Sequence, residues 1–224
     1  KQLMLTQNIN FKNFKLKKFS KKVKEDLNVL LKEKNEILKS LSSSYKNSYN
    51  KKIILKYKKY SNIRVIGMGG SILGTESIYD FLIHKIKKKF YFNNNLQPKI
   101  DNFDKKKCIN LIVSKSGNTL ETISNTNVII KNTDKNIFIT ENKKSYLNFL
   151  CKDLKAEIVH HNNFIGGRYS VLSEVGMLPA ELMGLNVGKF KQLNNLIKNK
   201  KFINALITNV NNTILFVKQK RFNS

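Results

Sequence analysis

Two short turns in this sequence carry the residues best suited to hold an anion. The first follows an apolar run and consists of Gly67, Gly69, Gly70 and Ser71. The second follows another apolar run and reads Ser114-Lys115-Ser116-Gly117-Asn118-Thr119. Glycines let the backbone approach a ligand, and amides at a helix start, hydroxyls and a lysine suit a phosphate dianion. Both turns are therefore predicted to bind phosphate.

The first turn fits neither common nucleotide motif. A dinucleotide fingerprint needs glycine where Ile72 stands, and an acidic residue where the chain has asparagines 93–95. A Walker A loop needs a lysine after the last glycine, but Thr75 follows Gly74 directly. Two plainer interpretations stay open: tight turns without a ligand, and a solvated Lys115.

Alternating patterns predict the elements that position these turns. Strands are expected at Ile63–Ile66, Phe90–Phe92, Cys108–Val113, Asn136–Ile139 and Ala156–Val159. Helical spacing occupies the stretches between them, at Ser71–Lys88, Thr119–Lys131 and Lys143–Cys151. Repeated strand–helix units predict an α/β fold: a doubly wound, mostly parallel five-stranded sheet with helices on both faces. Ligands of such sheets bind beyond the carboxyl ends of the strands.

Helical patterns also flank this sheet. One amphipathic helix is predicted at Lys21–Leu41, another at Ser170–Leu185 with a kink or break at Pro179, and a third at about Lys189–Asn209. We expect residues 1–60 to form an N-terminal helical extension, 61–187 the sheet domain and 188–224 a helical connector.

Several residues are expected to be structural only. His160 and His161 should point to opposite faces of a strand end, which does not suit a shared metal ion. Cys108 and Cys151 lack the spacing of a zinc site, and no metal is expected. An apolar helical stripe is assigned to the core: Tyr169, Val171, Leu172, Val175, Leu178 and Leu182.

The net charge of +27 raises the question of nucleic-acid binding. However, lysines spread over nearly every segment beside abundant Asn and Ile, a composition typical of an AT-rich genome. Arginine, the preferred reader of bases and phosphates, occurs only as Arg64, Arg168 and Arg221. We attribute the charge to composition and expect no nucleic-acid partner. No apolar run approaches the roughly 18 residues of a membrane span, so we expect no membrane partner. Because the isolated Cys108 and Cys151 do not suggest a disulfide framework, we expect a protein of the reducing cytoplasm.

The motifs resemble a known family. GMGGSILG followed by SKSGNTLET resembles the sugar isomerase (SIS) fold with its flavodoxin-like strand order. Residues 163–173, NFIGGRYSVLS, resemble the signature of the glucose-6-phosphate isomerase family. The resemblance extends from about Ile63 to Leu185. The sequence departs from the family pattern at two positions. Glu174 stands where the family signature has a small residue or proline, and Asn118 stands where the family often has threonine.

The resemblance implies an activity and roles for residues. The family interconverts glucose 6-phosphate and fructose 6-phosphate in glycolysis and gluconeogenesis, through a cis-enediolate and without a cofactor. By resemblance, Arg168 stabilises the enediolate, although a structural ion pair is its alternative role. Gly70 and Ser71 would line the sugar pocket. The phosphate would be held by Ser114, Lys115, Ser116 and Thr119.

The family's general base Glu, ring-opening His and further Lys belong to a second sugar isomerase domain, and their motifs are not found here. The chain begins with Lys1 instead of Met, as a piece of a longer protein would, and it ends near where that domain is expected to begin. We therefore expect an N-terminal portion that binds sugar phosphate weakly and does not isomerise it. The whole protein is expected to be a homodimer, with the apolar segment Ile203–Val217 covered by the second domain or subunit. Two alternatives stay open: a sugar-phosphate-binding regulatory module without catalysis, and an isomerase of another sugar phosphate.

Overall fold

The computed structural model describes residues 21–96 and 108–219, which belong to two compact units. The larger unit comprises Ser44–Lys191, and the smaller unit combines the chain up to Ser43 with the chain from Gln192 onward. The sheet and both anion turns lie in the larger unit. The domain boundaries expected near residues 60 and 187 stay predictions about the whole protein.

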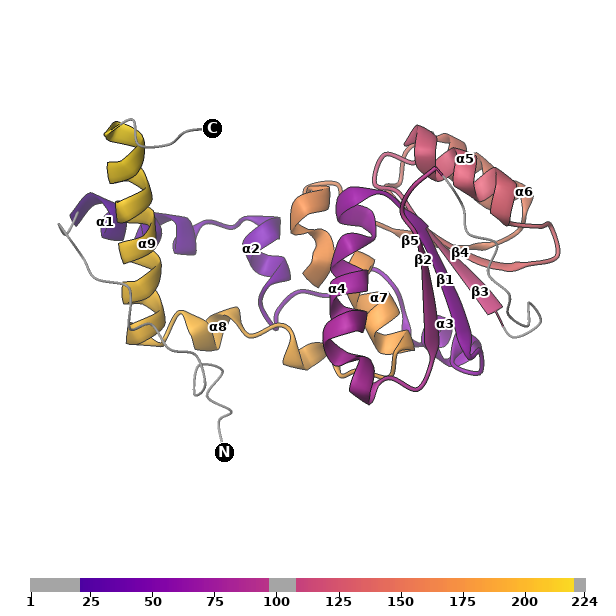
Figure 1. Ribbon diagram of the computed structural model, residues 1–224, viewed down its shortest axis with the longest axis horizontal. Helices are drawn as coiled ribbons and strands as arrows, with labels where there is room; N and C mark the ends of the chain where they lie inside the picture. The colour runs from indigo at the N-terminus through magenta and orange to yellow at the C-terminus, as the bar shows by residue number, and fades with distance from the viewer. Residues whose placement is uncertain (1–20, 97–107, 220–224) are drawn as a thin grey trace. The chain divides into compact units, whose positions relative to one another are not determined.

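A five-stranded sheet forms the centre of the larger unit (Figure 1). Every pairing is parallel, and the spatial order is β2-β1-β3-β4-β5. The strands are β1 (Asn62–Gly67), β2 (Lys89–Asn93), β3 (Cys108–Val113), β4 (Lys135–Thr140) and β5 (Glu157–His160). The α/β fold class, the strand number and the parallel arrangement predicted from the sequence are confirmed.

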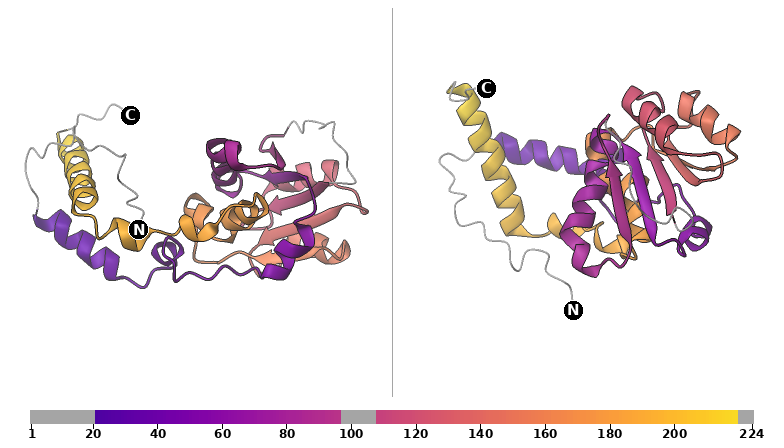
Figure 2. Two further views of the ribbon diagram at one scale, coloured as in Figure 1. Left: turned by 90° about the horizontal axis from the view of Figure 1, so that it is seen from below. Right: turned by 45° about the vertical axis from the view of Figure 1, so that its right-hand side comes forward.

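Helices cover both faces of the sheet, as Figures 1 and 2 show. One face packs against α3 (Lys51–Tyr57), α4 (Leu73–Leu82) and α7 (Glu174–Leu182). The other face packs against α5 (Leu120–Ile129) and α6 (Tyr146–Asp153). Because successive strand residues point to opposite faces, a sheet covered on both sides needs nearly continuous apolar strands. The runs in β1, β3 and β4 meet that need.

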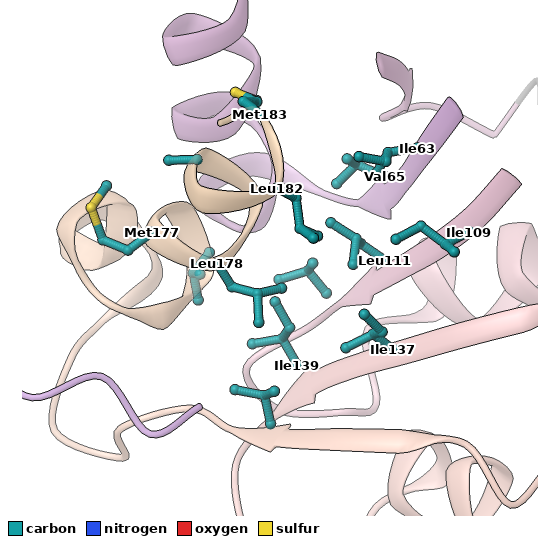
Figure 3. Packing of buried hydrophobic residues seen from close by; sticks show 14 of the residues in the cluster. Ile63, Val65, Ile109, Leu111, Ile137, Ile139, Met177, Leu178, Leu182 and Met183 are labelled. Atoms are coloured by element: carbon teal, nitrogen blue, oxygen red, sulfur yellow. The ribbon is translucent and has the colours of Figure 1, made fainter. Parts of the chain in front are cut away.

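The larger core lies between the sheet and α7 (Figure 3). Side chains from three strands meet Met177, Leu178, Leu182 and Met183 at the helix. The contributing strand residues are Ile63, Val65, Ile109, Leu111, Ile137 and Ile139. This apolar layer fixes α7 on the sheet, and with it the segment that leads into α7.

Three polar residues lie side by side on the opposite face, at the amino ends of the strands. The strand register pairs Arg64 with Asn110 and Asn110 with Asn136. The Asn110 side-chain amide donates to Asn136 Oδ1 at 2.8 Å, and Arg64 Nη1 donates to Asn110 Oδ1 at 3.5 Å. Buried polar groups are tolerated when they are hydrogen-bonded, and this ladder provides partners across three strands.

The helix predicted at Lys21–Leu41 is instead two helices. Helix α1 spans Lys21–Lys32, and α2 (Glu36–Ser40) starts anew after Asn35. The Asn35 side chain accepts a hydrogen bond from Ile37 N at 2.8 Å, which makes it an N-cap. Asparagine favours a helix start because its side chain accepts a hydrogen bond from a free backbone amide. The spacing of apolar residues does not reveal such a start, so it predicts one unbroken helix.

The segment 170–185 also differs from its prediction. A 3₁₀ helix spans Gly167–Leu172, and α7 begins after Ser173, whose Oγ accepts from Val175 N. The interruption therefore falls at Ser173, and α7 continues through Pro179. The helix predicted earlier in the chain, at Ser71–Lys88, is also shorter than expected. Helix α4 ends at Leu82, and a 3₁₀ turn follows it.

The smaller unit is helical in its described part. It contains α1 (Lys21–Lys32), α2, α8 (Leu193–Leu196) and α9 (Lys200–Lys218), with α1 lying against α9. The helix predicted at about Lys189–Asn209 is thus several pieces, and α9 starts where Asn199 caps it and runs further than predicted. Within residues 21–96 and 108–219, no helix has the length and apolar character needed to cross a membrane.

Candidate functional site

The strand order brings the two anion turns together. Strands β1 and β3 are neighbours, and their register pairs Gly67 with Val113, the last residue of each. From β1 the chain continues to β2 on one side of the pair, whereas from β3 it continues to β4 on the other side. A crevice opens where strand order reverses in this way, and ligands of doubly wound sheets bind there. Both turns lie at this switch point.

The turn after β3 is ordered by its own hydroxyl groups. Ser114 Oγ lies 2.9 Å from Thr119 Oγ1 and accepts a hydrogen bond from Gly117 N at 3.2 Å. Ser116 Oγ accepts from Asn118 N at 3.1 Å. Ser114 is buried, whereas Ser116 and Thr119 are half-buried. The hydroxyls are thus held in place beside the start of α5, where amide groups favour an anion.

The β4–α6 connection supports this turn from outside. Gly117 has a φ of +68°, and a Cβ there would lie 2.2 Å from Ser145 Oγ. Leu147 N donates to Gly117 O at 3.0 Å, and Tyr146 N donates to Asn118 Oδ1 at 2.8 Å. Asn118, which departs from the family signature, therefore joins the turn to the first residue of α6.

The ammonium group of Lys115 contacts residues from two other segments. Its ammonium group donates to the carbonyl oxygen of Asn163 at 2.8 Å and lies 3.3 Å from Glu141 Oε1. An ammonium group has three donors, so one stays available for a phosphate oxygen. Lys143 also pairs with Glu141, which leaves two lysines against one carboxylate. The local charge is positive and suits an anionic ligand.

Glu141 is nearly buried, and burial alone would raise the pKa of its carboxyl group. Hydrogen bonds from Lys143 and Lys115 outweigh burial and hold that pKa below its usual value. The carboxylate is therefore ionised at neutral pH, and it positions Lys115.

The turn after β1 packs directly on a third segment, which contains the Gly-Gly-Arg motif. A Cβ on Gly70 would lie 2.2 Å from the carbonyl oxygen of Gly167, so a side chain there requires the backbone to move. Ser170 Oγ donates to the carbonyl oxygens of both glycines, at 3.2 Å to Gly70 and 2.7 Å to Gly167. The glycines are needed for this close approach of two backbones. Ser71 ends the 3₁₀ turn Gly69–Ser71 and is half-buried.

Arg168 follows this contact and is exposed. Within residues 21–96 and 108–219 it has no ion pair or hydrogen bond, which does not favour a structural ion pair as its role. It lines a groove of about 690 Å³ together with Gly70 and Gly167. The rest of the groove is largely apolar and comes mostly from α4, so Arg168 supplies the charged side chain of its lining.

A buried network behind this motif was missed by the sequence analysis. Glu174 and His161 are 0% and 2% exposed, and the carboxylate oxygen Oε1 lies 2.8 Å from His161 Nδ1. The same oxygen accepts from Asn162 N at 2.7 Å, and Tyr45 donates its hydroxyl to Oε2 at 2.9 Å. The segment from His161 to Arg168 is thus anchored to the first residue of α7.

The partners of His161 determine where its protons lie. Nε2 faces the carbonyl oxygen of Ile165 at 3.0 Å, so this nitrogen carries a hydrogen. Nδ1 faces a carboxylate, so one further proton lies between the histidine and Glu174. Burial would raise the pKa of Glu174, but hydrogen bonds from His161, Asn162 and Tyr45 hold it below its usual value. His161 is therefore a partner of a buried acid, unlike the exposed His160 at the strand end.

Other predicted residues divide between core and surface. Val175, Leu178 and Leu182 are buried as expected, but Tyr169 is 55% exposed because it lies in the 3₁₀ helix beside Arg168. In the described part of the chain, no three His, Cys, Asp or Glu side chains are grouped as a metal site requires.

Comparison with solved structures relates the fold to a protein of similar architecture. A hypothetical protein from Thermus thermophilus superposes with a TM-score of 0.65 over 87% of this chain and 51% of its own, at 18% identity. At this identity the likeness concerns the fold alone.

Curated sequences give closer relations. Glucose-6-phosphate isomerase of Methanocaldococcus jannaschii is 34% identical over 68% of this chain and 43% of its own length. The Borreliella burgdorferi glucose-6-phosphate isomerase is 31% identical over 67% of this chain and 34% of its own length. The chain thus spans less than half the length of these relatives. Residues 15–213 match the family described as phosphoglucose isomerase. These matches show that the chain belongs to the phosphoglucose isomerase family.

Proposed function

We propose that this chain is the N-terminal portion of an enzyme that interconverts glucose 6-phosphate and fructose 6-phosphate. In this proposal it supplies the phosphate site and the enediolate-stabilising arginine, while the second domain supplies the general base. The observation that carries the proposal is the position of Arg168. Its guanidinium, unpaired within residues 21–96 and 108–219, lies on a segment that contacts the first anion turn through Gly167 and the second through Asn163.

The phosphate contacts serve to position the sugar. Ser114, Lys115, Ser116 and Thr119 would hold the phosphate at a distance from the carbons that react. Binding energy from such a remote group fixes the reacting atoms and so lowers the barrier. Gly70 and Ser71 would line the sugar pocket beside it, where the absence of a side chain at Gly70 leaves the backbone accessible.

Arg168 would act on the reaction intermediate. Proton transfer between C1 and C2 develops negative charge on the enediolate oxygens, and a guanidinium placed there favours the transition state over the bound sugar. Because the base is expected outside these residues, the chain alone should bind sugar phosphate without turnover. In the whole protein, we expect a homodimer in the cytoplasm.

Two substitutions test the proposed roles. Lys115→Ala should weaken fructose 6-phosphate binding to this chain by about 10–100-fold in calorimetry, the loss expected for a charge-assisted hydrogen bond. Lys144→Ala, which removes an exposed lysine from the β4–α6 connection, is the matched control and should bind normally. Unchanged binding by Lys115→Ala would contradict the assigned phosphate site.

Arg168→Ala separates an isomerase from a sugar-phosphate sensor. In the chain joined to its second domain, this change should lower kcat by about 10²–10³-fold and leave affinity nearly unchanged. A longer protein without isomerase activity whose sugar-phosphate binding tolerates Arg168→Ala would favour the regulatory module. Turnover by the 224-residue chain alone would show that a base lies within it.

A further inference from the structure

We propose that the larger unit has a second anion site, for a phosphorylated small molecule, at the amino ends of β1 and β2. The site is a cavity of about 590 Å³ between α3, the segment that enters β2 and the C-terminal end of α7. It lies at the opposite end of the strands from the two turns described above. Four lysines line it: Lys58, Lys85, Lys87 and Lys88.

Lys88 provides the main argument for a ligand in this cavity. Its Nζ atom exposes less than 1 Å² to solvent and has no hydrogen-bond partner in the described residues. Burial and the nearby positive charge of Lys58 both lower the pKa of Lys88. A buried ammonium group without an acceptor destabilises a protein. Rotation of the Lys88 side chain toward an anion in the cavity would remove that penalty.

The surrounding charges leave this ammonium uncompensated. Lys58, Lys85 and Lys87 are exposed, and none of the four lysines forms a salt bridge within residues 21–96 and 108–219. Glu181 is the one carboxylate in the cavity lining, and burial together with the negative charge of Glu181 raises the pKa of Tyr49. The cavity therefore has an excess of positive charge.

The excess of lysine in the whole chain does not explain this arrangement. Compositional bias adds lysines at the surface, where water solvates the ammonium group, but it does not bury one. Lys88 lies directly before β2, whose next residue, Lys89, is exposed. The two neighbours have the same side chain and different environments, which makes Lys89 a matched control.

The lining also indicates the chemistry of the ligand. Lysine ammonium groups bind phosphate as point charges. Apolar side chains form another part of the wall, including Ile54, Leu182 and Val187. A cavity of this volume falls in the range that accepts small organic ligands. The combination suits a phosphate group attached to an organic body.

Calorimetry on the full 224-residue chain tests the site, with the Lys115→Ala background used to remove the phosphate turn after β3. Inorganic phosphate, glucose 6-phosphate and adenosine monophosphate are the probes. We expect at least one organic phosphate to bind more tightly than inorganic phosphate. Adding Lys88→Met should weaken its binding at least tenfold, whereas adding Lys89→Met should change it less than twofold.

Thermal unfolding gives an independent readout. Without anions, Lys88→Met should unfold at a higher temperature than the parent chain, because the substitution removes an uncompensated buried charge. The parent should gain stability with the organic phosphate, and the variant should not. If Lys88→Met fails to fold, Lys58→Met at an exposed position replaces it in both experiments, with the same expected direction of binding loss.

Equal binding by the Lys88→Met and Lys89→Met variants would overturn the site. Equal affinity for inorganic phosphate and both organic phosphates would overturn the assigned ligand class. Both results are distinguishable from failure of the proposed isomerase role, because the background already lacks Lys115 and the two sites lie at opposite ends of the strands.

Discussion

At the scale of residues, the candidate site depends on how closely two backbones approach. Gly70 and Gly167 come from turns about 100 residues apart in the sequence, and neither has a side chain to keep them separate. This contact places Arg168 beside the first anion turn. The hydroxyls of the second turn depend in the same way on Gly117, whose positive φ and crowded surroundings exclude other residues.

Replacing Gly70 by alanine should therefore damage the site. The added Cβ would lie 2.2 Å from Gly167 O, so the segment carrying Arg168 must shift. We expect sugar-phosphate binding to weaken by about tenfold or more, since positioned sites are sensitive to displacements near 1 Å. Gly166→Ala is the control in calorimetry, because its Cβ would make an ordinary contact of 3.6 Å with Tyr169. Equal affinities for the two variants would refute this account.

At the scale of elements, α7 connects the core to the site. Its inner side packs on three strands, and its first residue, Glu174, receives hydrogen bonds from His161, Asn162 and Tyr45. The buried acid occupies a position where the family signature has a small residue or proline. In this chain the helix start is thereby bonded to the segment that carries Arg168.

The core contribution of α7 is measurable. Leu178 is 0% exposed, so Leu178→Ala should lower the free energy of unfolding by about 2–5 kcal/mol through lost contacts and a cavity. Leu120→Ala in α5 makes the same chemical change at a position that is 72% exposed, and it should alter stability by less than about 0.5 kcal/mol. Urea denaturation of both variants checks the difference, and similar losses would mean that α7 is not packed as described.

The sequence was a good guide to strands and a poorer guide to helix ends. Apolar runs such as Cys108–Val113, which only Asn110 interrupts, are bounded by polar residues, so their limits were predicted within one or two residues. Helix ends depend on single capping contacts, such as those of Asn35 and Ser173. The spacing of apolar residues does not reveal such contacts. The same pattern placed both anion turns at the ends of strands, although their function stays a prediction.

The missed network has a different cause. His161 and Glu174 are 13 residues apart, and Tyr45 lies 129 residues from Glu174. Nothing in local spacing relates them, because their contact follows from where β5 ends and α7 begins in space. The departure of Glu174 from the family signature was the available signal, and it identified the residue without its partners.

At the scale of the whole molecule, ionisation of buried acids links stability to pH. The folded pKa values of Glu174 and Glu141 lie below the usual glutamate value of 4.5. Their stabilisation is present above that value and is lost as the pH falls through the folded pKa values. Protonation also increases an already large positive charge.

We therefore expect these two carboxyl groups to cause almost no change in the free energy of unfolding between about pH 6 and 7. Below about pH 4.5 the free energy of unfolding should fall. Urea denaturation at several pH values would measure this dependence. Glu174→Gln keeps the shape of the side chain and removes one titrating group, so its acid decline should be shallower. Glu25→Gln, at an exposed position in α1, should leave the curve unchanged. A wild-type curve that rises toward pH 4 would contradict the assignment.

The pairing of α1 with α9 has a consequence for how the chain is synthesised. About 170 residues separate the end of α1 from the start of α9, and they contain the whole unit Ser44–Lys191. At common translation rates α1 leaves the ribosome about 10–30 s before α9 exists. The sheet unit can close in that interval, since its ends meet where Lys191 donates to Asn47. Helix α1 is thus made well before the partner that it packs against.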